Sequence, residues 1–372
     1  MTADAVGGVW TYATSLIREL CAQGFEITLV TLGPQPRSDQ IRDIAGIKGL
    51  QVETTDLALE WMDPDARDLP RALAQLAAIE QRVSPDVVHL NGFREATGEW
   101  NAPVIVVAHS CVRSWWLACR DEEASEPRWL EYIANVQRGL ASASCWVAPT
   151  YAFRDMMESL YAPATHGRVI WNGIDRLAAS ARSTSSPKQP LILAAGRLWD
   201  EAKNIAALGR IANHLPWPIR VAGSLAAHGS IESAPASGVE ALGELTRDGL
   251  HEEMTRAAIF VAPALYEPFG LTVLEAAQAG CALVLSDQPS FRELWDGAAS
   301  FADARDEIAL QDALLQLIGD EAQRRELQRR AVRRAERYSL AAMAENYAAL
   351  YDELVQRRAP RMVQHKYAGA AP

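Results

Sequence analysis

The sequence lacks the features that mark membrane-spanning, secreted or disulfide-rich proteins. None of its apolar runs approaches the roughly 18–20 residues that a membrane-spanning helix needs. The N-terminus has no basic segment followed by an apolar one, so no signal peptide is indicated. The five cysteines are scattered and show no C-x-x-C spacing, a pattern that fits reduced thiols. We therefore expect a cytoplasmic protein.

Several ligand-binding motifs are also missing. Without G-x-x-x-x-G-K-[ST] or G-x-G-x-x-G, the sequence disfavours a P-loop or a dinucleotide-binding enzyme. The seven histidines show neither H-x-x-x-H nor H-E-x-x-H spacing, so we expect no metal site. A D-x-D motif at Asp63 and Asp65 lies in an acidic, proline-containing loop and not after a buried strand. We interpret it as a solvated loop that caps a helix.

The charge balance restricts the partners. The net charge is −11, and most of it falls in residues 1–175, which argues against nucleic acid and against an anionic membrane held by a broad basic face. Residues 324–337 are rich in arginine, but glutamates are interspersed, which favours a solvated helix face. A local basic patch and the oligomeric state stay open.

Short β-branched runs alternate with longer amphipathic segments along most of the chain. The predicted strands are residues 25–32, 87–90, 104–108, 145–148, 168–171, 191–195, 219–222, 239–242, 259–262 and 282–285. The predicted helices are residues 10–22, 72–82, 129–140, 153–160, 204–214, 250–257, 271–279, 308–317 and 321–355. This alternation predicts an α/β protein whose parallel sheets are covered on both faces.

A length of 372 residues exceeds what one hydrophobic core usually supports. We therefore predict two Rossmann-like domains that face each other across a cleft, with ligands at the carboxyl ends of the strands. The expected bounds are 1–175 for the N-terminal domain, 176–190 for a linker and 191–338 for the C-terminal domain. A helix at 339–357 is expected to pack back on the N-terminal domain, and 358–372 reads as a frayed tail.

The N-terminal domain begins unusually. Gly7 and Gly8 form a turn that opens the first helix, yet only six residues precede them. A first strand normally needs about 5–6 residues. The first strand is therefore expected to be truncated or missing, either because it is short or because the chain begins downstream of a natural start.

The segment from Glu267 to Glu275 carries the clearest chemical pattern. Its two carboxylates have seven residues between them and bracket Phe269, Gly270 and Leu271, where a strand leads through a loop into a helix. Gly270 frees the backbone at the helix entrance, and the first-turn N–H groups can hold a phosphate. The layout suits a sugar nucleotide, with hydroxyl groups at both ends. The alternative is that Glu267 caps the helix and Glu275 faces solvent.

Three further motifs occur at predicted strand ends in a recognisable order. They are Gly7-Gly8-Val9-Trp10, Ala108-His109-Ser110, and Gly196-Arg197-Leu198 leading to Glu201-Ala202-Lys203-Asn204. Together with the two-glutamate segment they resemble the retaining family-4 glycosyltransferases of the GT-B fold. The resemblance implies transfer of a hexose from a nucleotide sugar to an acceptor hydroxyl, with retention of anomeric configuration and without a metal. It implies no further cofactor; a UDP- or GDP-hexose is the expected donor.

The resemblance also implies roles for individual residues. Arg197 and Lys203 would contact the diphosphate, and His109 would form a hydrogen bond to the donor sugar near the point of transfer. Glu267 would bind hydroxyl groups of the sugar, and Glu275 would bind the ribose.

Glycines would complete the donor site. The N–H groups of residues 269–271 would face sugar and phosphate. Gly7 and Gly8 would let the backbone approach the phosphate or acceptor. Two alternatives remain for the charged residues: His109 is structural, or Arg197 and Lys203 pair with Asp200 or Glu201 at the surface. Family members commonly carry a basic residue where this chain has Ala202.

The acceptor is less well defined by the sequence. Trp115 and Trp116 could stack on a sugar ring or an acyl chain, although core packing is the alternative. The acceptor class therefore stays open among carbohydrates, lipids and small molecules. Other functions on the same fold also stay open, namely a sugar-nucleotide epimerase, a phosphorylase or a non-catalytic nucleotide-sugar-binding protein.

Overall fold

The computed structural model describes residues 1–175, 188–224 and 237–367, with side chains up to residue 358. Residues 176–187 of the predicted linker lie outside this range. The linker was predicted two residues too long, because strand β8 (Gln189–Ala195) already begins at Gln189. This shift of boundary reflects how weakly turn composition fixes the first residue of a strand.

Contacts divide the chain into two compact units. Unit 1 comprises Met1–Leu117, Glu122–Gly173 and Leu340–Pro372, and unit 2 comprises Ala118–Asp121 and Ile174–Ser339. Each unit is built on parallel β-sheet with helices in the crossovers, so the predicted α/β fold with two Rossmann-like halves is confirmed.

Seven strands form the sheets of unit 1. They are β1 (Thr2–Asp4), β2 (Ile27–Leu32), β3 (Leu50–Thr54), β4 (Val88–Leu90), β5 (Val104–Val107), β6 (Cys145–Ala148) and β7 (Arg168–Val169). Their order is β1-β2-β3 in one sheet and β4-β5-β6-β7 in another, with parallel pairing throughout.

The predicted truncation of the first strand is confirmed. Strand β1 has three residues and pairs with β2, where Thr2 lies opposite Val30. Side-chain bonds connect β1 to the end of β4. The Asn91 N–H donates to Thr2 Oγ1 at 3.1 Å, and Asn91 Nδ2 donates to the Thr2 carbonyl at 2.6 Å. These two hydrogen bonds of Asn91 join β1 to the end of β4, although the two strands belong to different sheets.

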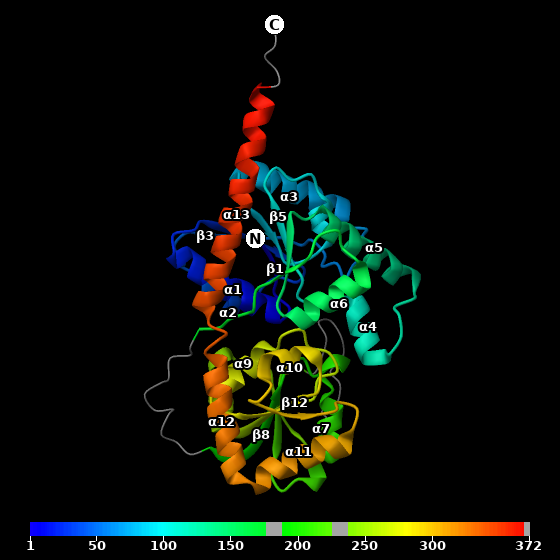
Figure 1. Ribbon diagram of the computed structural model, residues 1–372, viewed down its shortest axis with the longest axis vertical. Helices are drawn as coiled ribbons and strands as arrows, with labels where there is room; N and C mark the ends of the chain where they lie inside the picture. Colours follow the sequence, from blue (N-terminus) through cyan, green and yellow to red (C-terminus); the bar gives the residue numbers. More distant parts are fainter. Residues whose placement is uncertain (176–187, 225–236, 368–372) are drawn as a thin grey trace. The chain divides into compact units, whose positions relative to one another are not determined.

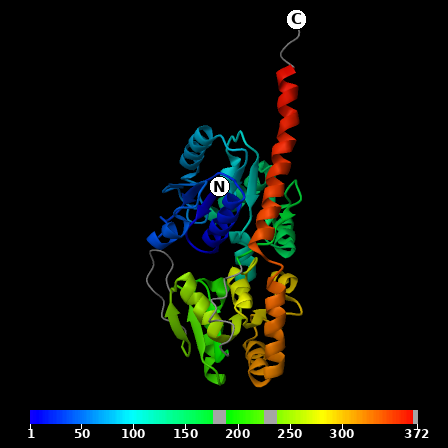
Figure 2. The same ribbon diagram turned by 90° about the vertical axis from the view of Figure 1, so that its left-hand side faces the viewer.

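Helices of unit 1 surround these strands. They are α1 (Gly8–Ala22), α2 (Ser38–Ile44), α3 (Leu69–Val83), the 3₁₀ turn η1 (Arg94–Thr97), α4 (Val112–Arg120), α5 (Pro127–Ser142), α6 (Tyr151–Tyr161) and α13 (Leu340–Tyr367). Helix α13 packs against α1 and extends beyond the rest of unit 1 (Figures 1 and 2). The predicted tail at 358–372 is wrong in its first part, because α13 continues to Tyr367.

Unit 2 contains one six-stranded parallel sheet. Its strands are β8, β9 (Ile219–Ala222), β10 (Glu240–Gly243), β11 (Ala257–Ala262), β12 (Ala282–Ser286) and β13 (Ser300–Ala302). The order is β10-β9-β8-β11-β12-β13. Strands β8, β9 and β10 follow one another towards one edge of the sheet, whereas β11, β12 and β13 follow one another towards the other edge. The switch point lies between β8 and β11, and open α/β sheets bind ligands at such points.

Helices cover both faces of the unit 2 sheet (Figure 1). Those on one face are α9 (Leu271–Gln278), α10 (Pro289–Trp295) and α12 (Glu321–Ala335), and those on the other are α7 (Ile205–Ile211) and α11 (Glu307–Gly319). The remaining elements are α8 (Arg247–Arg256) and the 3₁₀ turns η2 (Glu201–Lys203) and η3 (Ala212–His214).

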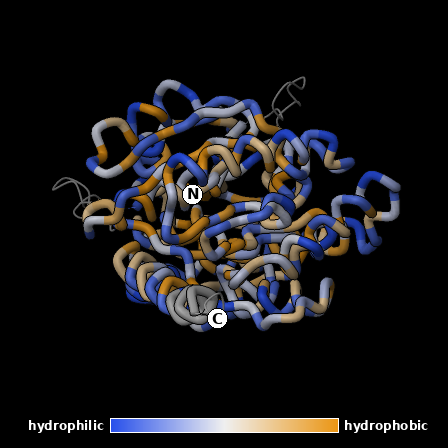
Figure 3. The backbone as a smooth tube through the Cα atoms, turned by 90° about the horizontal axis from the view of Figure 1, so that it is seen from above, coloured by the Kyte–Doolittle hydropathy of each residue, from blue (hydrophilic) through white to orange (hydrophobic). Residues whose placement is uncertain are grey.

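Burial on both faces explains the uninterrupted apolar strands of unit 2. Along β11, Phe260 packs into the core beneath α9 and α10, whereas its neighbours Ile259 and Val261 pack into the core beneath α7 and α11. Each such side chain contributes about 1.5–3 kcal/mol when fully buried. Most surface helices alternate hydrophobic and hydrophilic residues, as the orange and blue segments of Figure 3 show, whereas α9 is buried at five consecutive residues.

Candidate active site

The donor-type residues predicted from the sequence come together at the switch point of unit 2. Arg197 and Lys203 follow β8, and Glu267 and Gly270 follow β11. Strands β8 and β11 are hydrogen-bonded neighbours, with Ile192 opposite Ile259. The two loops therefore leave the sheet side by side at its carboxyl edge.

Lys203 and Glu267 form a direct ion pair. Lys203 Nζ lies 2.5 Å from Glu267 Oε2, although the residues are 64 positions apart in the chain. The side chains are only 21% and 17% exposed. Lys203 therefore does not pair with Asp200 or Glu201, and Glu267 does not cap a helix, so both sequence-based alternatives are wrong for these two residues.

Backbone tethers hold this pair in place. The Leu265 N–H donates to the Ala202 carbonyl at 2.8 Å, which joins the loop after β8 to the loop after β11. Asn204 has a left-handed backbone (φ 52°), and its side-chain amide donates to the carbonyls of Pro263 at 3.1 Å and Ala304 at 2.8 Å. Asn204, the residue that follows Lys203, thus holds the backbone of this loop in place.

The segment after β12 fixes the backbone of Glu267. The Glu267 N–H donates to Gln288 Oε1 at 3.2 Å, and Ser290 Oγ donates to the Glu267 carbonyl at 2.5 Å. Sequence reasoning missed Asn204, Gln288 and Ser290 as supporting residues. Gln288 and Ser290 could have been found by position, since they closely follow the predicted strand at 282–285, and Asn204 stood in the motif with Lys203 without an assigned role.

Arg197 follows one of the sequence-based alternatives. Its guanidinium pairs with Asp200 Oδ2 at 2.7 Å and lies over the Trp199 ring, 5.5 Å from the centroid. Asp200 also accepts the Ala202 N–H at 3.0 Å and so caps η2. The Arg197 side chain is 45% exposed, whereas the Asp200 side chain beneath it is only 6% exposed, so the guanidinium can be reached from solvent. A diphosphate can therefore compete for this guanidinium.

The N-terminus of α9 presents uncapped backbone N–H groups. Gly270 is the N-cap at φ 88° and supplies no side-chain cap, and the first turn contains no acidic residue. A Cβ at this position would lie 3.0 Å from the Phe291 ring, so the entrance requires glycine. Phe269 is buried in the core against Tyr338, which leaves its backbone as the part that can face a ligand. Leu271 begins the helix and is half-buried.

Glu275 lies inside the protein, so the alternative that it faces solvent is wrong. Its side chain is 9% exposed on α9. Burial raises its pKa to about 7, opposed by the charge of Arg247. None of the residues that the structure describes forms a hydrogen bond with its carboxyl group. A buried carboxyl without a partner is costly, and such groups mark functional sites.

In unit 1, His109 follows β5 and is half-buried. Its Nε2 lies 2.8 Å from Asn91 Oδ1, and its ring packs edge-on against Tyr12 at 4.5 Å. Burial lowers the pKa of His109 to about 3, so the ring is neutral at neutral pH. Asn91 was missed as a candidate residue, although it follows β4 directly.

The other predicted residues of unit 1 have mixed placements. Gly7 and Gly8 are exposed at the start of α1, and Gly7 is an N-cap without a side-chain cap. Trp115 and Trp116 lie on α4, both half-buried, with their rings edge-on at 6.3 Å. Their predicted contact with the acceptor stays a prediction.

The D-x-D loop differs from its interpretation as a solvated cap. The Asp63 carboxylate accepts the N–H groups of Arg67 and Asp68 at 3.0 and 2.9 Å. It also pairs with the buried guanidinium of Arg94 at 2.8 Å. The motif therefore organises its own loop, and Asp65 makes only an exposed pair with Arg67.

Sequence models of two families match the chain in tandem. The model of Glycosyltransferase Family 4 matches residues 6–176, and that of Glycosyl transferases group 1 matches residues 189–320. The chain belongs to the family-4 glycosyltransferases of the GT-B fold. Its curated relatives include the D-inositol 3-phosphate glycosyltransferase of Nocardia farcinica (strain IFM 10152), 26% identical over 94% of this chain and 85% of that protein. Sucrose-phosphate synthase of Zea mays is 33% identical, but over 24% of this chain and 8% of its own length.

Solved structures resemble this glycosyltransferase over nearly its whole length. A sucrose-phosphate synthase from Thermosynechococcus elongatus superposes with a TM-score of 0.79 at 18% identity, covering 96% of this chain and 99% of that one. HepE from Anabaena, in complex with UDP-glucose, gives a TM-score of 0.71 at 14% identity, covering 95% and 98%. At these identities the likeness establishes the fold.

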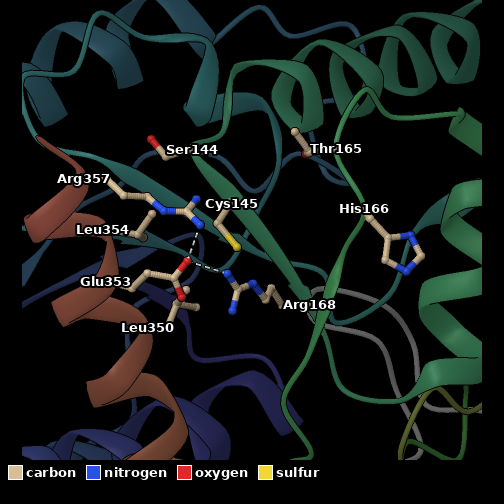
Figure 4. A pocket seen from close by; sticks show the side chains of 9 residues that line it. All are labelled: Ser144, Cys145, Thr165, His166, Arg168, Leu350, Glu353, Leu354 and Arg357. Atoms are coloured by element: carbon tan, nitrogen blue, oxygen red, sulfur yellow. Dashed lines mark hydrogen bonds and ion pairs between the residues drawn. The ribbon is translucent and has the colours of Figure 1, made fainter. Parts of the chain in front are cut away.

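A separate cavity of the glycosyltransferase, about 150 Å³ in volume, lies in unit 1 beside α13 (Figure 4). It opens near Ser144 and Cys145, at the amino end of β6, whereas His109 lies at the carboxyl end of β5. Figure 4 shows Glu353 between two guanidinium groups, and each of Arg168 and Arg357 approaches its Oε1 to 2.6 Å. This cavity is not part of the strand-end site.

No helix in the described part of the glycosyltransferase is long and apolar enough to cross a membrane. In residues 1–175, 188–224 and 237–358, no group of three or more His, Cys, Asp or Glu side chains could hold a metal ion.

Proposed function

We propose that this glycosyltransferase moves a hexose from UDP or GDP to an acceptor hydroxyl, with retention of anomeric configuration and without a metal ion. The observation that carries the proposal is the Lys203–Glu267 pair beside the uncapped N-terminus of α9. A cation, a carboxylate and free backbone N–H groups are thereby gathered at the switch point where parallel sheets bind nucleotides.

The proposed chemistry depends on charge that develops on the leaving diphosphate. The bond between the anomeric carbon and the phosphate oxygen breaks, and the acceptor oxygen bonds to the anomeric carbon on the same face. The acceptor proton passes to the leaving phosphate. Lys203, Arg197 and the N–H groups at α9 supply the stabilisation, and this support makes a metal unnecessary.

The carboxylates divide the recognition of the donor between them. Glu267 accepts hydrogen bonds from hexose hydroxyls, because the Lys203 pair and the Gln288 and Ser290 contacts hold it in place. Glu275 accepts hydrogen bonds from the ribose diol, which would give its carboxyl group the partner that it lacks among the described residues. Two hydrogen bonds to a charged group contribute about 1.5–3 kcal/mol each.

The first test is Glu267→Ala. Transfer and slow donor hydrolysis should fall by roughly 100-fold or more, which corresponds to the loss of about 2.7 kcal/mol of transition-state stabilisation. The circular dichroism spectrum should be unchanged. The matched control is Glu252→Ala on α8, an exposed glutamate that pairs with Arg256 at 3.5 Å. Near-normal turnover by folded Glu267→Ala would refute the assignment.

The second test is Lys203→Ala, measured by titration with UDP and GDP. Loss of one charge-assisted contact should weaken nucleotide binding by roughly 10- to 100-fold. Lys48→Ala, an exposed lysine of unit 1, removes the same charge as a control. Equal affinities of the two variants would contradict the diphosphate role.

One series of assays tests separately which nucleotide sugar is the donor, whether a metal is needed and whether the anomeric configuration is retained. A thermal-shift screen of UDP- and GDP-hexoses should show stabilisation of about 2.7 kcal/mol at 100 times the dissociation constant. Turnover should survive a chelator, and proton NMR should show a product with the donor's anomeric configuration. Inversion, or complete loss of activity with the chelator that added Mg²⁺ restores, would overturn that part of the proposal.

A further inference from the structure

Asn91 is the centre of a hydrogen-bond cluster that ends at His109. Its Oδ1 lies 2.8 Å from His109 Nε2 and 3.3 Å from His89 Nε2. Its Nδ2 donates to the Thr2 carbonyl at 2.6 Å. His89 Nδ1 in turn lies 2.7 Å from the hydroxyl of Tyr351 on α13.

The contact with Thr2 determines the orientation of the Asn91 amide. A backbone carbonyl only accepts, so the group that faces Thr2 must be the NH₂ of Asn91. The oxygen of Asn91 then faces both imidazole rings, and an amide oxygen also only accepts. His109 must therefore donate from Nε2, which places the single proton of the neutral ring on that nitrogen.

We propose that Asn91 is a positioning residue that holds His109 as the Nε2–H tautomer, so that its Nδ1 accepts a hydrogen bond from a hydroxyl of the bound sugar. The identity of the ligand rests on the proposed function, whereas the tautomer does not. Among the residues that the structure describes, none forms a hydrogen bond with His109 Nδ1, and the ring is half-buried.

Among the residues that the structure describes, no carboxylate contributes to the lowered pKa of His109. Tyr12 from α1 packs against its ring, and His89, Tyr347 and Tyr351 complete the cluster. Burial raises the pKa of each of these tyrosines. It also lowers the pKa of His89 to about 3, and the amino group of Met1 and His109 add to that effect.

Among the residues that the structure describes, the amino group of Met1 also acts on His89, and burial lowers the pKa of this amino group to about 5. Both imidazole rings and the amino group are therefore neutral at neutral pH, although the hydrogen bond with Asn91 opposes the lowering of the pKa of His89. His109 offers an acceptor as long as it stays neutral, and protonation would convert Nδ1 into a donor.

The tautomer can be measured without any substrate. Nitrogen-15 NMR of histidine-labelled protein distinguishes the two neutral tautomers and the imidazolium, and the spectrum of His109→Ala identifies the resonances of this residue among the seven histidines. We expect a neutral ring protonated on Nε2 from pH 6 to pH 8. A ring protonated on Nδ1, or on both nitrogens, would overturn the proposal whatever the activity.

Substitution of Asn91 then tests the consequence for catalysis. Asn91→Ala should lower kcat/KM by roughly tenfold, the equivalent of one hydrogen bond of about 1.4 kcal/mol. The NMR signals of His109 should shift towards a mixture of tautomers. Asn346→Ala on α13, an exposed asparagine bonded to its own helix, should leave both readouts unchanged.

Asn91→Asp tests whether Asn91 positions His109, because a residue with a merely structural role would not change the pH dependence of activity. The carboxylate would favour the imidazolium and raise the pKa of His109, so activity should be low at pH 6 and recover as the pH rises. Wild-type activity should show no titration of this residue in that range. A pH profile parallel to that of the wild type would refute the assignment. If the variant does not fold, the wild-type NMR spectrum decides alone.

Discussion

The buried carboxyl of Glu275 leads to a prediction that joins stability to donor binding. The perturbation is Glu275→Gln, which keeps the shape of the side chain and removes its ionisation. Burial raises the pKa of Glu275 from 4.5 to about 7 in the folded protein. That change corresponds to about 3 kcal/mol, because each pKa unit is worth about 1.36 kcal/mol.

The sign of the effect follows from proton linkage. Between pH 4.5 and pH 7 the unfolded chain has released the proton of Glu275 while the folded chain still holds it, so stability falls as the pH rises. The penalty is absent below the unfolded pKa and complete above the folded one. From pH 5 to pH 8, wild type should lose about 2.5 kcal/mol relative to Glu275→Gln.

The assay is thermal unfolding of both proteins across this pH range. For a unit of this size, 2.5 kcal/mol corresponds to a change of about 5–10 °C in the difference between the two Tm values. The buried amide of glutamine carries its own cost, but that cost does not depend on pH. The informative quantity is therefore the change of the Tm difference with pH.

Ligand binding supplies an independent measurement. A ribose diol donates to a carboxylate better than to a carboxylic acid, so donor binding at pH 6 should release nearly one proton in wild type and none through this residue in Glu275→Gln. Calorimetry of UDP-glucose binding in two buffers of different ionisation enthalpy measures this release. A Tm difference that is constant from pH 5 to pH 8, or one of opposite sign, would refute the reasoning.

Two further predictions concern the loops that hold the donor site. Asn204→Ala removes two hydrogen bonds and places alanine in a left-handed conformation, so unit 2 should lose about 2–3 kcal/mol and bind UDP more weakly. Asn204→Gly keeps the backbone conformation, and full recovery of UDP affinity in that variant would show that the tethers are unimportant. Gly223→Ala would place its Cβ 1.7 Å from the Gly196 carbonyl oxygen at φ 143°, which should cost about 3 kcal/mol and displace the Arg197 loop. Unchanged denaturation midpoints and nucleotide affinity would contradict this expectation.

The sequence predicted the central strands well and the edge strands poorly. Strand β11 was expected at 259–262 and β5 at 104–108, because strands buried on both faces read as continuous apolar runs. Strand β3 was missed, since its sequence LQVET alternates apolar and polar residues and no residue of it is fully buried. Strand β13 was not recognised, because three residues give no period to detect, and β1 was expected only as a short or missing strand before Gly7.

The individual residues of the candidate site were predictable from the sequence, but the contacts between them were not. Polar residues at strand ends could be recognised in the chain, and Lys203 and Glu267 were recognised in this way. Their ion pair depends on β8 and β11 being neighbours, which is a property of the sheet order. The link between Asn91 and His109 was missed for the same reason, since it requires β4 and β5 to end side by side.

The candidate groups of unit 2 are cationic, whereas the histidine cluster of unit 1 is neutral, and the proposed reaction has a use for each kind of group. Unit 2 supplies Lys203, Arg197 and the uncapped N-terminus of α9, and these are the groups that stabilise a diphosphate as it gains charge. Unit 1 supplies His109 from a cluster that is uncharged at neutral pH. A neutral imidazole is a poor ligand for a diphosphate and offers a hydrogen-bond acceptor to a hydroxyl group. Under the proposed function, the low pKa of His109 therefore suits recognition of the hexose and not of the leaving group.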